Sequence, residues 1–275
     1  SEDMGWYSDD AKGTPLYRQY NPYAYANNHN YTTDKAENDH LVEVGWKAEG
    51  TGDVAWFLDE TTAADKVAVT AAKKLFAAAK ISPKIITGGS IGKALKVLGF
   101  LPEAKAAAEQ FAAFLKAEGV KTLVVSNPAA FDALTKDYPE FGVKLPCKVL
   151  CFSGFLNQAK VKFTKKAGEL YYLADDFMRN YDGCECPEKL LKTLKADLRP
   201  FGTNDEESYC CGEGAIVLDK LNPALVKALA EYVAARADDP KKDKIVVLSA
   251  YTKKCLAKYG KLNVVTMEEV AASCL

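Results

Sequence analysis

The feature that most constrains the fold is an alternation of two kinds of segment from Asp53 onward. Short runs rich in valine and isoleucine alternate with longer segments whose apolar residues recur at helical spacing. Strands are predicted at 54–57, 84–86, 122–125, 148–152, 170–173, 244–248 and 262–266, and helices at 63–80, 102–118, 187–195, 223–236 and 251–258. Short apolar strands separated by helices indicate parallel sheets with right-handed crossovers. The sequence therefore predicts an α/β fold.

The alternation occurs twice, which predicts two pseudo-equivalent lobes with parallel sheets, at 53–145 and 146–275. Residues 1–52 have a different composition, rich in aromatic residues and asparagine, and form a third part of the chain. We expect a small mixed module there, with a strand at 16–20. All eight cysteines fall in the predicted second lobe.

Composition is that of an ordinary globular protein, with 275 residues, 48% hydrophobic and 27% charged. Such a chain can bury a substantial core. Its formal net charge of -1 gives no electrostatic footprint for nucleic acid or for an anionic membrane. There is also no apolar run of the length that a bilayer requires. We therefore expect neither nucleic-acid binding nor membrane insertion.

The most distinctive motif is a pair of adjacent cysteines, Cys210 and Cys211, on a glycine-rich stretch. Neighbouring side chains on a strand point to opposite faces, so both thiols reach one ligand only where the backbone turns. Gly212 and Gly214 permit such a turn. A metal or redox site is one interpretation of this pair. The other is that the cysteines are buried small hydrophobic residues or form disulfides.

Further ligands for a site at this pair could come from nearby in the sequence. Cys184 and Cys186 bring the number of thiols in this stretch to four, and Asp176 is a possible substitute ligand. Iron–sulfur clusters need about four such ligands, and structural zinc sites usually space paired cysteines by two to four residues. The candidate cofactor-binding residues are therefore Cys210, Cys211, Cys184, Cys186 and Asp176, whereas Cys147 and Cys151 are predicted to lie in the core of a strand.

The segments 207–215, 136–140 and 186–191 resemble the CCG family, which includes the cluster-bearing subunit of heterodisulfide reductase. The resemblance extends over two copies of a pattern, from about Asp53 to Val270. It implies a duplicated α/β scaffold whose cysteines bind iron–sulfur clusters.

Most ligand positions of that pattern hold other residues in this chain. The first copy has Asp59 or Glu60, then 87–89 and 127–130, and the second has 173–176 and 249–252. The resemblance therefore implies a non-catalytic scaffold or binding protein with a protein partner and no cofactor. The alternative is a redox protein with one iron–sulfur cluster in the second lobe, or a dithiol site at Cys210 and Cys211. Whether the protein binds a small molecule is left open.

Two further segments have characteristic patterns. The stretches 15–22, 28–33, 36–39 and 45–50 resemble a repeat unit of secreted and cell-wall-associated bacterial proteins, which implies a secreted or cell-surface location, with the cytoplasm as the alternative. The stretch 86–94 runs from a strand into a helix with three glycines, like a nucleotide-binding loop. Its spacing matches neither the dinucleotide fingerprint nor the phosphate loop. The alternative follows from the resemblance to the CCG family: Gly88 and Gly89 align with its Cys-Cys-Gly turn and fill the space of the cluster cysteines.

Overall fold

A computed structural model of the chain describes residues 17–20, 29–32, 45–175, 177–178, 184–201, 211–213 and 218–275. In the N-terminal part, β1 (Tyr17–Tyr20) pairs with β2 (His29–Thr32) in antiparallel orientation. The strand predicted at 16–20 is thus confirmed as β1.

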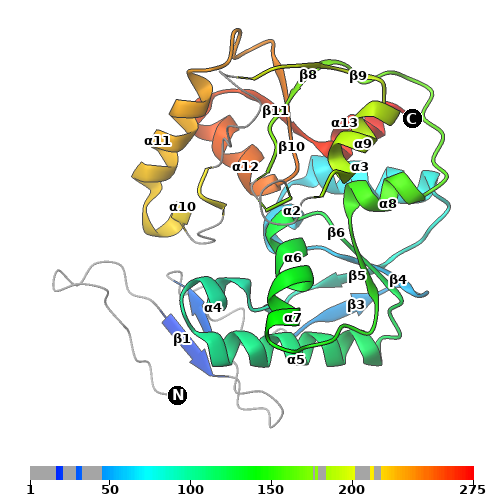
Figure 1. Ribbon diagram of the computed structural model, residues 1–275, viewed down its shortest axis with the longest axis vertical. Coiled ribbons are helices and arrows are strands. Elements are labelled where there is room, and N and C mark those ends of the chain that lie inside the picture. Colours follow the sequence, from blue (N-terminus) through cyan, green and yellow to red (C-terminus); the bar gives the residue numbers. More distant parts are fainter. Residues whose placement is uncertain are drawn as a thin grey trace.

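The predicted fold class is confirmed, because two sheets of mainly parallel strands lie in two α/β lobes (Figure 1). The first sheet has the order β3-β5-β4-β6-β7, and the second has the order β11-β10-β8-β9. All neighbouring strands pair in parallel, except that β3 is antiparallel to β5. The strands are β3 (Lys47–Glu49), β4 (Val54–Phe57), β5 (Lys84–Thr87), β6 (Thr122–Val125), β7 (Lys148–Cys151), β8 (Gly168–Tyr172), β9 (Ala196–Arg199), β10 (Lys244–Val247) and β11 (Asn263–Thr266).

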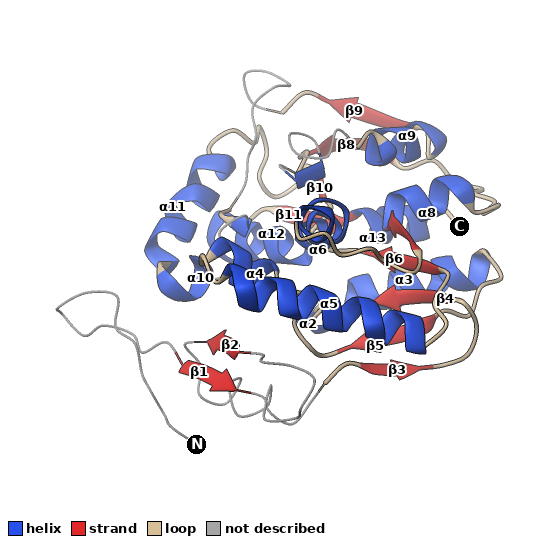
Figure 2. Ribbon diagram, turned by 60° about the horizontal axis from the view of Figure 1, so that its bottom comes forward, coloured by secondary structure: helices blue, strands red, loops and turns tan. Residues whose placement is uncertain are grey.

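Helices cover both faces of each sheet (Figure 2). They are α2 (Glu60–Ala64), α3 (Lys66–Ala78), α4 (Lys93–Val97), α5 (Leu101–Ala117), α6 (Pro128–Asp132), α7 (Tyr138–Glu140), α8 (Phe152–Gln158), α9 (Cys186–Thr193), α10 (Leu218–Leu221), α11 (Pro223–Ala234), α12 (Ala250–Cys255) and α13 (Met267–Ser273), with π-helical turns η1 (Ala133–Asp137) and η4 (Leu256–Gly260). In the part of the chain that the structure describes, no helix is long and apolar enough to cross a membrane.

One apolar core lies between the two sheets and is shared by both lobes. Trp56 of the first sheet and Val246 of the second belong to it, and helices α3, α8, α9 and α13 fill the space between them. The residues that follow and precede Trp56, Phe57 and Ala55, face a second core under α5 instead. This alternation with period two is the reason why each strand reads as a continuous apolar run.

Sequence and structure differ in a few elements. The strand predicted at 148–152 was assigned to the second lobe. In the structure it is β7, which pairs with β6 and completes the first sheet. The helix predicted at 63–80 is divided at Asp65, whose side chain accepts a hydrogen bond from the Ala68 backbone and caps α3. The elements that were not predicted include strands β3 and β9 and helices α6, α8, α10 and α13. Strand β9 is exposed and charged, and α13 begins directly at the end of β11. The division of the chain at residues 52 and 145 stays a prediction.

Three positions interpreted as former cluster ligands have another role in the structure. Asp59, Asn127 and Ser249 are the N-cap residues of α2, α6 and α12, and each side chain accepts a backbone hydrogen bond from the first turn of its helix. Each follows the carboxyl end of a parallel strand, where a helix must start. Aspartate, asparagine and serine are favoured at such positions because they satisfy unpaired N–H groups. Local helix capping therefore accounts for these residues without any lost cofactor.

The shared core predicts a large effect for Phe76 of α3, whose ring lies 4.9 Å from that of Phe155 and 5.2 Å from that of Phe152. Phe76→Ala should lower the free energy of unfolding by about 3–5 kcal/mol, because it leaves a cavity between the lobes. Urea denaturation measures this change. Val67→Ala, at an exposed position on the same helix, is the control and should change it by less than about 0.5 kcal/mol. Equal effects of the two changes would contradict the shared core.

Candidate metal centre

Three cysteine sulfurs meet where the first lobe contacts the start of α9. The Sγ atoms of Cys151, Cys184 and Cys186 all lie within 4.8 Å of one another, and those of Cys151 and Cys184 are 4.0 Å apart. Cys151 is buried, while Cys184 and Cys186 are partly exposed. All three are free thiols in the structure. In the described ranges, this is the one group of at least three cysteine, histidine or acidic side chains that is compact enough to hold a metal ion.

The backbone positions the three thiols. Cys151 ends β7 and is the N-cap of α8, and its sulfur accepts a hydrogen bond from the Gly154 N–H at 3.3 Å. Cys186 is the first residue of α9, and the Asn157 side-chain amide of α8 donates to its carbonyl at 2.8 Å. Helix α8 thus holds both sides of the cluster. A side chain at Gly154 would begin 3.2 Å from the Cys151 sulfur and 3.4 Å from the Cys186 sulfur, so glycine lets the backbone approach them.

Protons are distributed unequally among these thiols. A hydrogen bond from Cys151 lowers the pKa of Cys186 to about 6, helped by Cys184 and by the positive charge of Lys189. The same donor lowers the pKa of Cys184. The pKa of Cys151 is raised, because its proton is held by these two partners and because the residue is buried. Near neutral pH the cluster therefore contains thiolate character at Cys186 and a proton on Cys151.

The structure brings together two of the five residues that the sequence proposed as a site. Cys184 and Cys186 lie side by side, but their third partner is Cys151. Cys211 is fully buried in the outer core of the second lobe, where the Tyr251 hydroxyl donates to its carbonyl. Cys210 and Asp176 lie outside the described residues. The five residues stay a prediction as a set.

Sequence reasoning missed Cys151 because its strand was interpreted as pure core. A residue at the carboxyl end of a parallel strand is both buried by its sheet and placed at the edge where functional groups gather. The signal that could have identified Cys151 is its position as the last residue of β7, directly before helix α8.

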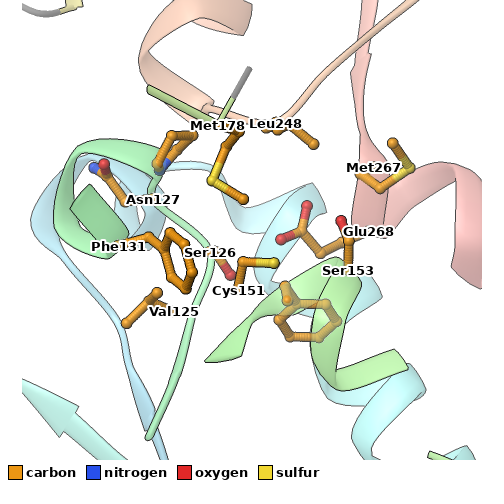
Figure 3. A pocket seen from close by; sticks show the side chains of 12 residues that line it. Val125, Ser126, Asn127, Phe131, Cys151, Ser153, Met178, Leu248, Met267 and Glu268 are labelled. Atoms are coloured by element: carbon orange, nitrogen blue, oxygen red, sulfur yellow. The ribbon is translucent and has the colours of Figure 1, made fainter. Parts of the chain in front are cut away.

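A small cavity adjoins Cys151 at the interface between the lobes (Figure 3). Apart from Met178, it is lined by residues at or just after the ends of β6, β7, β10 and β11, so the carboxyl ends of both sheets face it. In Figure 3 the side chains of Ser126, Cys151 and Glu268 point toward the same space. The volume of about 10 Å³ accommodates no more than one water molecule. As the lobes stand, this cavity has no room for a larger ligand.

Glu268 is a buried ionisable group at this interface. Burial raises the pKa of its carboxyl to about 7, against hydrogen bonds from its own N–H, Ser126 and Thr266 that favour the charged form. The Trp56 indole N–H donates to the Ser126 hydroxyl at 3.2 Å, so the polar chain continues into the first lobe. The two lobes are thus joined by a buried polar chain as well as by apolar packing.

A second buried carboxyl, Glu213, lies in the outer part of the second lobe. It accepts hydrogen bonds from the hydroxyls of Ser249 at 2.6 Å and Thr252 at 3.1 Å. Burial and the nearby charge of Asp175 raise its pKa well above the usual value. These contacts fill the space beside the 249–252 segment with oxygen atoms, and this fixes the 211–213 segment against α12.

The glycine-rich stretch at 86–94 is explained by packing. Gly89 has a φ of +61°, and a Cβ there would come within 2.4 Å of the Trp46 ring nitrogen. Lys93, the cation that a phosphate would need, instead forms ion pairs with Asp132 and with Asp137. The turn therefore supports Trp46 and an ion-pair network and offers no phosphate site.

Comparisons with known proteins give a family match for the N-terminal part alone. Residues 1–57 match a domain of unknown function (DUF5648). No curated protein matches the sequence.

Solved structures of similar fold include three amino-acid racemases. An aspartate racemase from Picrophilus torridus is 13% identical, with a TM-score of 0.38 over 81% of this chain and 92% of that chain. A glutamate racemase from Bacillus anthracis is 19% identical, with a TM-score of 0.36 over 82% of this chain and 80% of that chain. A glutamate racemase from Aquifex pyrophilus is 15% identical, with a TM-score of 0.32 over 80% of this chain and 81% of that chain. Likeness at this level gives no argument about the activity of this chain.

The assignment of the chain to the CCG family is wrong. The family model that matches, on residues 1–57, is that of a different domain. The scaffold function derived from that family, and the alternative of iron–sulfur or dithiol electron transfer at Cys210 and Cys211, are wrong with it. The physical reason agrees, since supposed ligand positions are helix caps and Cys211 lies in a different core from Cys184 and Cys186.

Glu268 predicts a pH-dependent stability. Its folded-state pKa of about 7 exceeds the usual 4.5, so the folded chain holds this proton more tightly than the unfolded chain. Its contribution is complete below pH 4.5 and is lost as the pH rises through 7, a change of about 3 kcal/mol. Glu268→Gln should therefore remove a fall in stability between pH 5 and pH 8, measured by urea denaturation. Glu109→Gln, at an exposed acid of α5, is the control, and an unchanged slope in Glu268→Gln would contradict the assignment.

Proposed function

We propose that this protein binds a thiophilic metal ion through Cys151, Cys184 and Cys186. The observation that carries the proposal is the mutual distance of the three sulfurs, at most 4.8 Å. Zinc–thiolate bonds are about 2.3 Å long, which places the sulfurs of one site roughly 4 Å apart. The 4.0 Å between the Cys151 and Cys184 sulfurs fits such a site.

The electrostatics of the cluster support metal binding. Metal ions bind thiolates, and the pKa values of Cys184 and Cys186 are already lowered. The proton of Cys151, which these two sulfurs share as acceptors, occupies the place that a cation takes on binding. Binding releases this proton, so affinity falls with pH wherever the free protein holds it. The fall steepens below about pH 6, where Cys186 is protonated as well.

A metal ion at this position acts as a cross-link. Cys151 belongs to the last strand of the first sheet, whereas Cys184 and Cys186 lead into α9, which packs on the second sheet. An ion that binds only the folded chain stabilises it by mass action. The sequence favoured a protein without a cofactor, and metal analysis of the purified protein decides between that expectation and this proposal.

Removing any of the three sulfurs should weaken binding of cadmium(II) by about 100-fold or more, because even groups that only support a ligand contribute 10–100-fold. The sulfur-to-metal charge-transfer absorption, followed in an anaerobic titration of Cys151→Ser, Cys184→Ser and Cys186→Ser, measures the affinity. Cys147→Ser is the matched control, since Cys147 is a half-buried thiol directly before the same strand. Cys211→Ser separates this site from the pair that the sequence suggested. Equal affinity in all five variants would refute the proposal.

Gly154 offers a test that does not remove a ligand. Gly154→Ala adds a Cβ within 3.4 Å of two sulfurs, so metal affinity should fall about tenfold, a change of about 1.4 kcal/mol. The same change favours helix α8 by about 0.5–1 kcal/mol. The free energy of unfolding of the metal-free protein should therefore not fall along with the metal affinity. Cadmium titration and urea denaturation of the metal-free protein measure the two effects. Undiminished affinity would show that the sulfurs do not act together.

A further inference from the structure

We infer that the metal ion keeps one open coordination position and that this position takes a small thiol from solution. This inference rests on the metal binding proposed above. It concerns what the site does with its ion, since a site closed by four protein ligands is structural, while a site with three protein ligands keeps a position for an outside ligand.

The ligand count carries the first step. Within the described ranges, the compact group consists of three sulfurs, and no imidazole or carboxylate oxygen lies within 4.8 Å of all of them. A tetrahedral ion held by these three atoms has a fourth corner, and no histidine or acidic side chain of the described ranges is placed to fill it.

The packing around the sulfurs indicates where that corner lies. On one side, the backbone of α8 closes the site: the Gly154 N–H donates to the Cys151 sulfur, and a Cβ at Gly154 would lie 3.2 Å from that sulfur. Cys151 itself is 7% exposed and faces the shared core. Cys184 and Cys186 are the partly exposed members of the cluster. The open position therefore lies on their side, which solvent reaches.

The donor set selects the chemical class of the outside ligand. Three thiolates bring three negative charges to a divalent ion, so the ion is electron-rich and polarises bound water less than an ion held by neutral imidazoles does. Soft donors favour a further soft donor at the same ion. A thiol binds by losing its proton to solvent and displacing the bound water, with no change of oxidation state. A small alkyl thiol is the ligand that this chemistry favours.

Cobalt(II) in place of the native ion makes the inference measurable on the full-length protein under anaerobic conditions. Adding 2-mercaptoethanol to the cobalt-loaded protein should raise the sulfur-to-cobalt charge-transfer absorption by about one third, because the number of bound sulfurs rises from three to four. Ethanolamine, which lacks the thiol, is the control ligand and should leave the band unchanged. In Cys184→Ser the charge-transfer absorption before thiol is added should be about one third weaker. This difference gives the absorption that one cobalt–sulfur bond contributes.

The outcomes separate this inference from the proposal on which it rests. A cobalt band that is present but does not respond to the thiol would overturn the open position and leave metal binding intact. A protein that shows no cobalt band, with its far-ultraviolet circular dichroism unchanged, would overturn both. A thiol that removes the cobalt from the protein would also overturn the open position, because the sulfur would then compete with the site.

Discussion

Burial of one apolar layer by both sheets determines how the rest of the molecule is arranged. Trp56 and Phe76 from the first half of the chain pack in the same core as Phe152, Leu190 and Val246 from the second half. Neither sheet can cover its inner face alone, so the lobes fold against each other rather than as independent domains. The carboxyl ends of strands from both sheets are thereby brought to one interface, where the small cavity lies.

This interface explains why the functional groups gather where they do. Strand β7 ends at Cys151, which lines the cavity on one side and joins the cluster with Cys184 and Cys186 on the other. One residue thus contributes both to the contact between the lobes and to the candidate metal centre.

Much of the fold could be predicted from the sequence because both sheets are buried on two faces. Apolar strands such as β4, β6 and β10 and the alanine-rich α5 carry their periodicity in the residues themselves. The site could not be predicted in the same way, because the meeting of Cys151 with Cys184 depends on which sheet β7 joins. Family resemblance misled for a related reason: aspartate, asparagine and serine after a strand look like replaced ligands, although helix capping alone requires them.

Strands β3 and β9, each at one edge of its sheet, affect how the molecule meets its neighbours. Strand β3 has three residues and exposes Lys47 and Glu49, and strand β9 exposes Asp197 and Arg199. An edge strand has unpaired backbone N–H and C=O groups, to which a strand of a neighbouring molecule can bind. Edge strands that are short and charged disfavour such pairing. At these two edges, addition of a strand from a neighbouring molecule is therefore disfavoured.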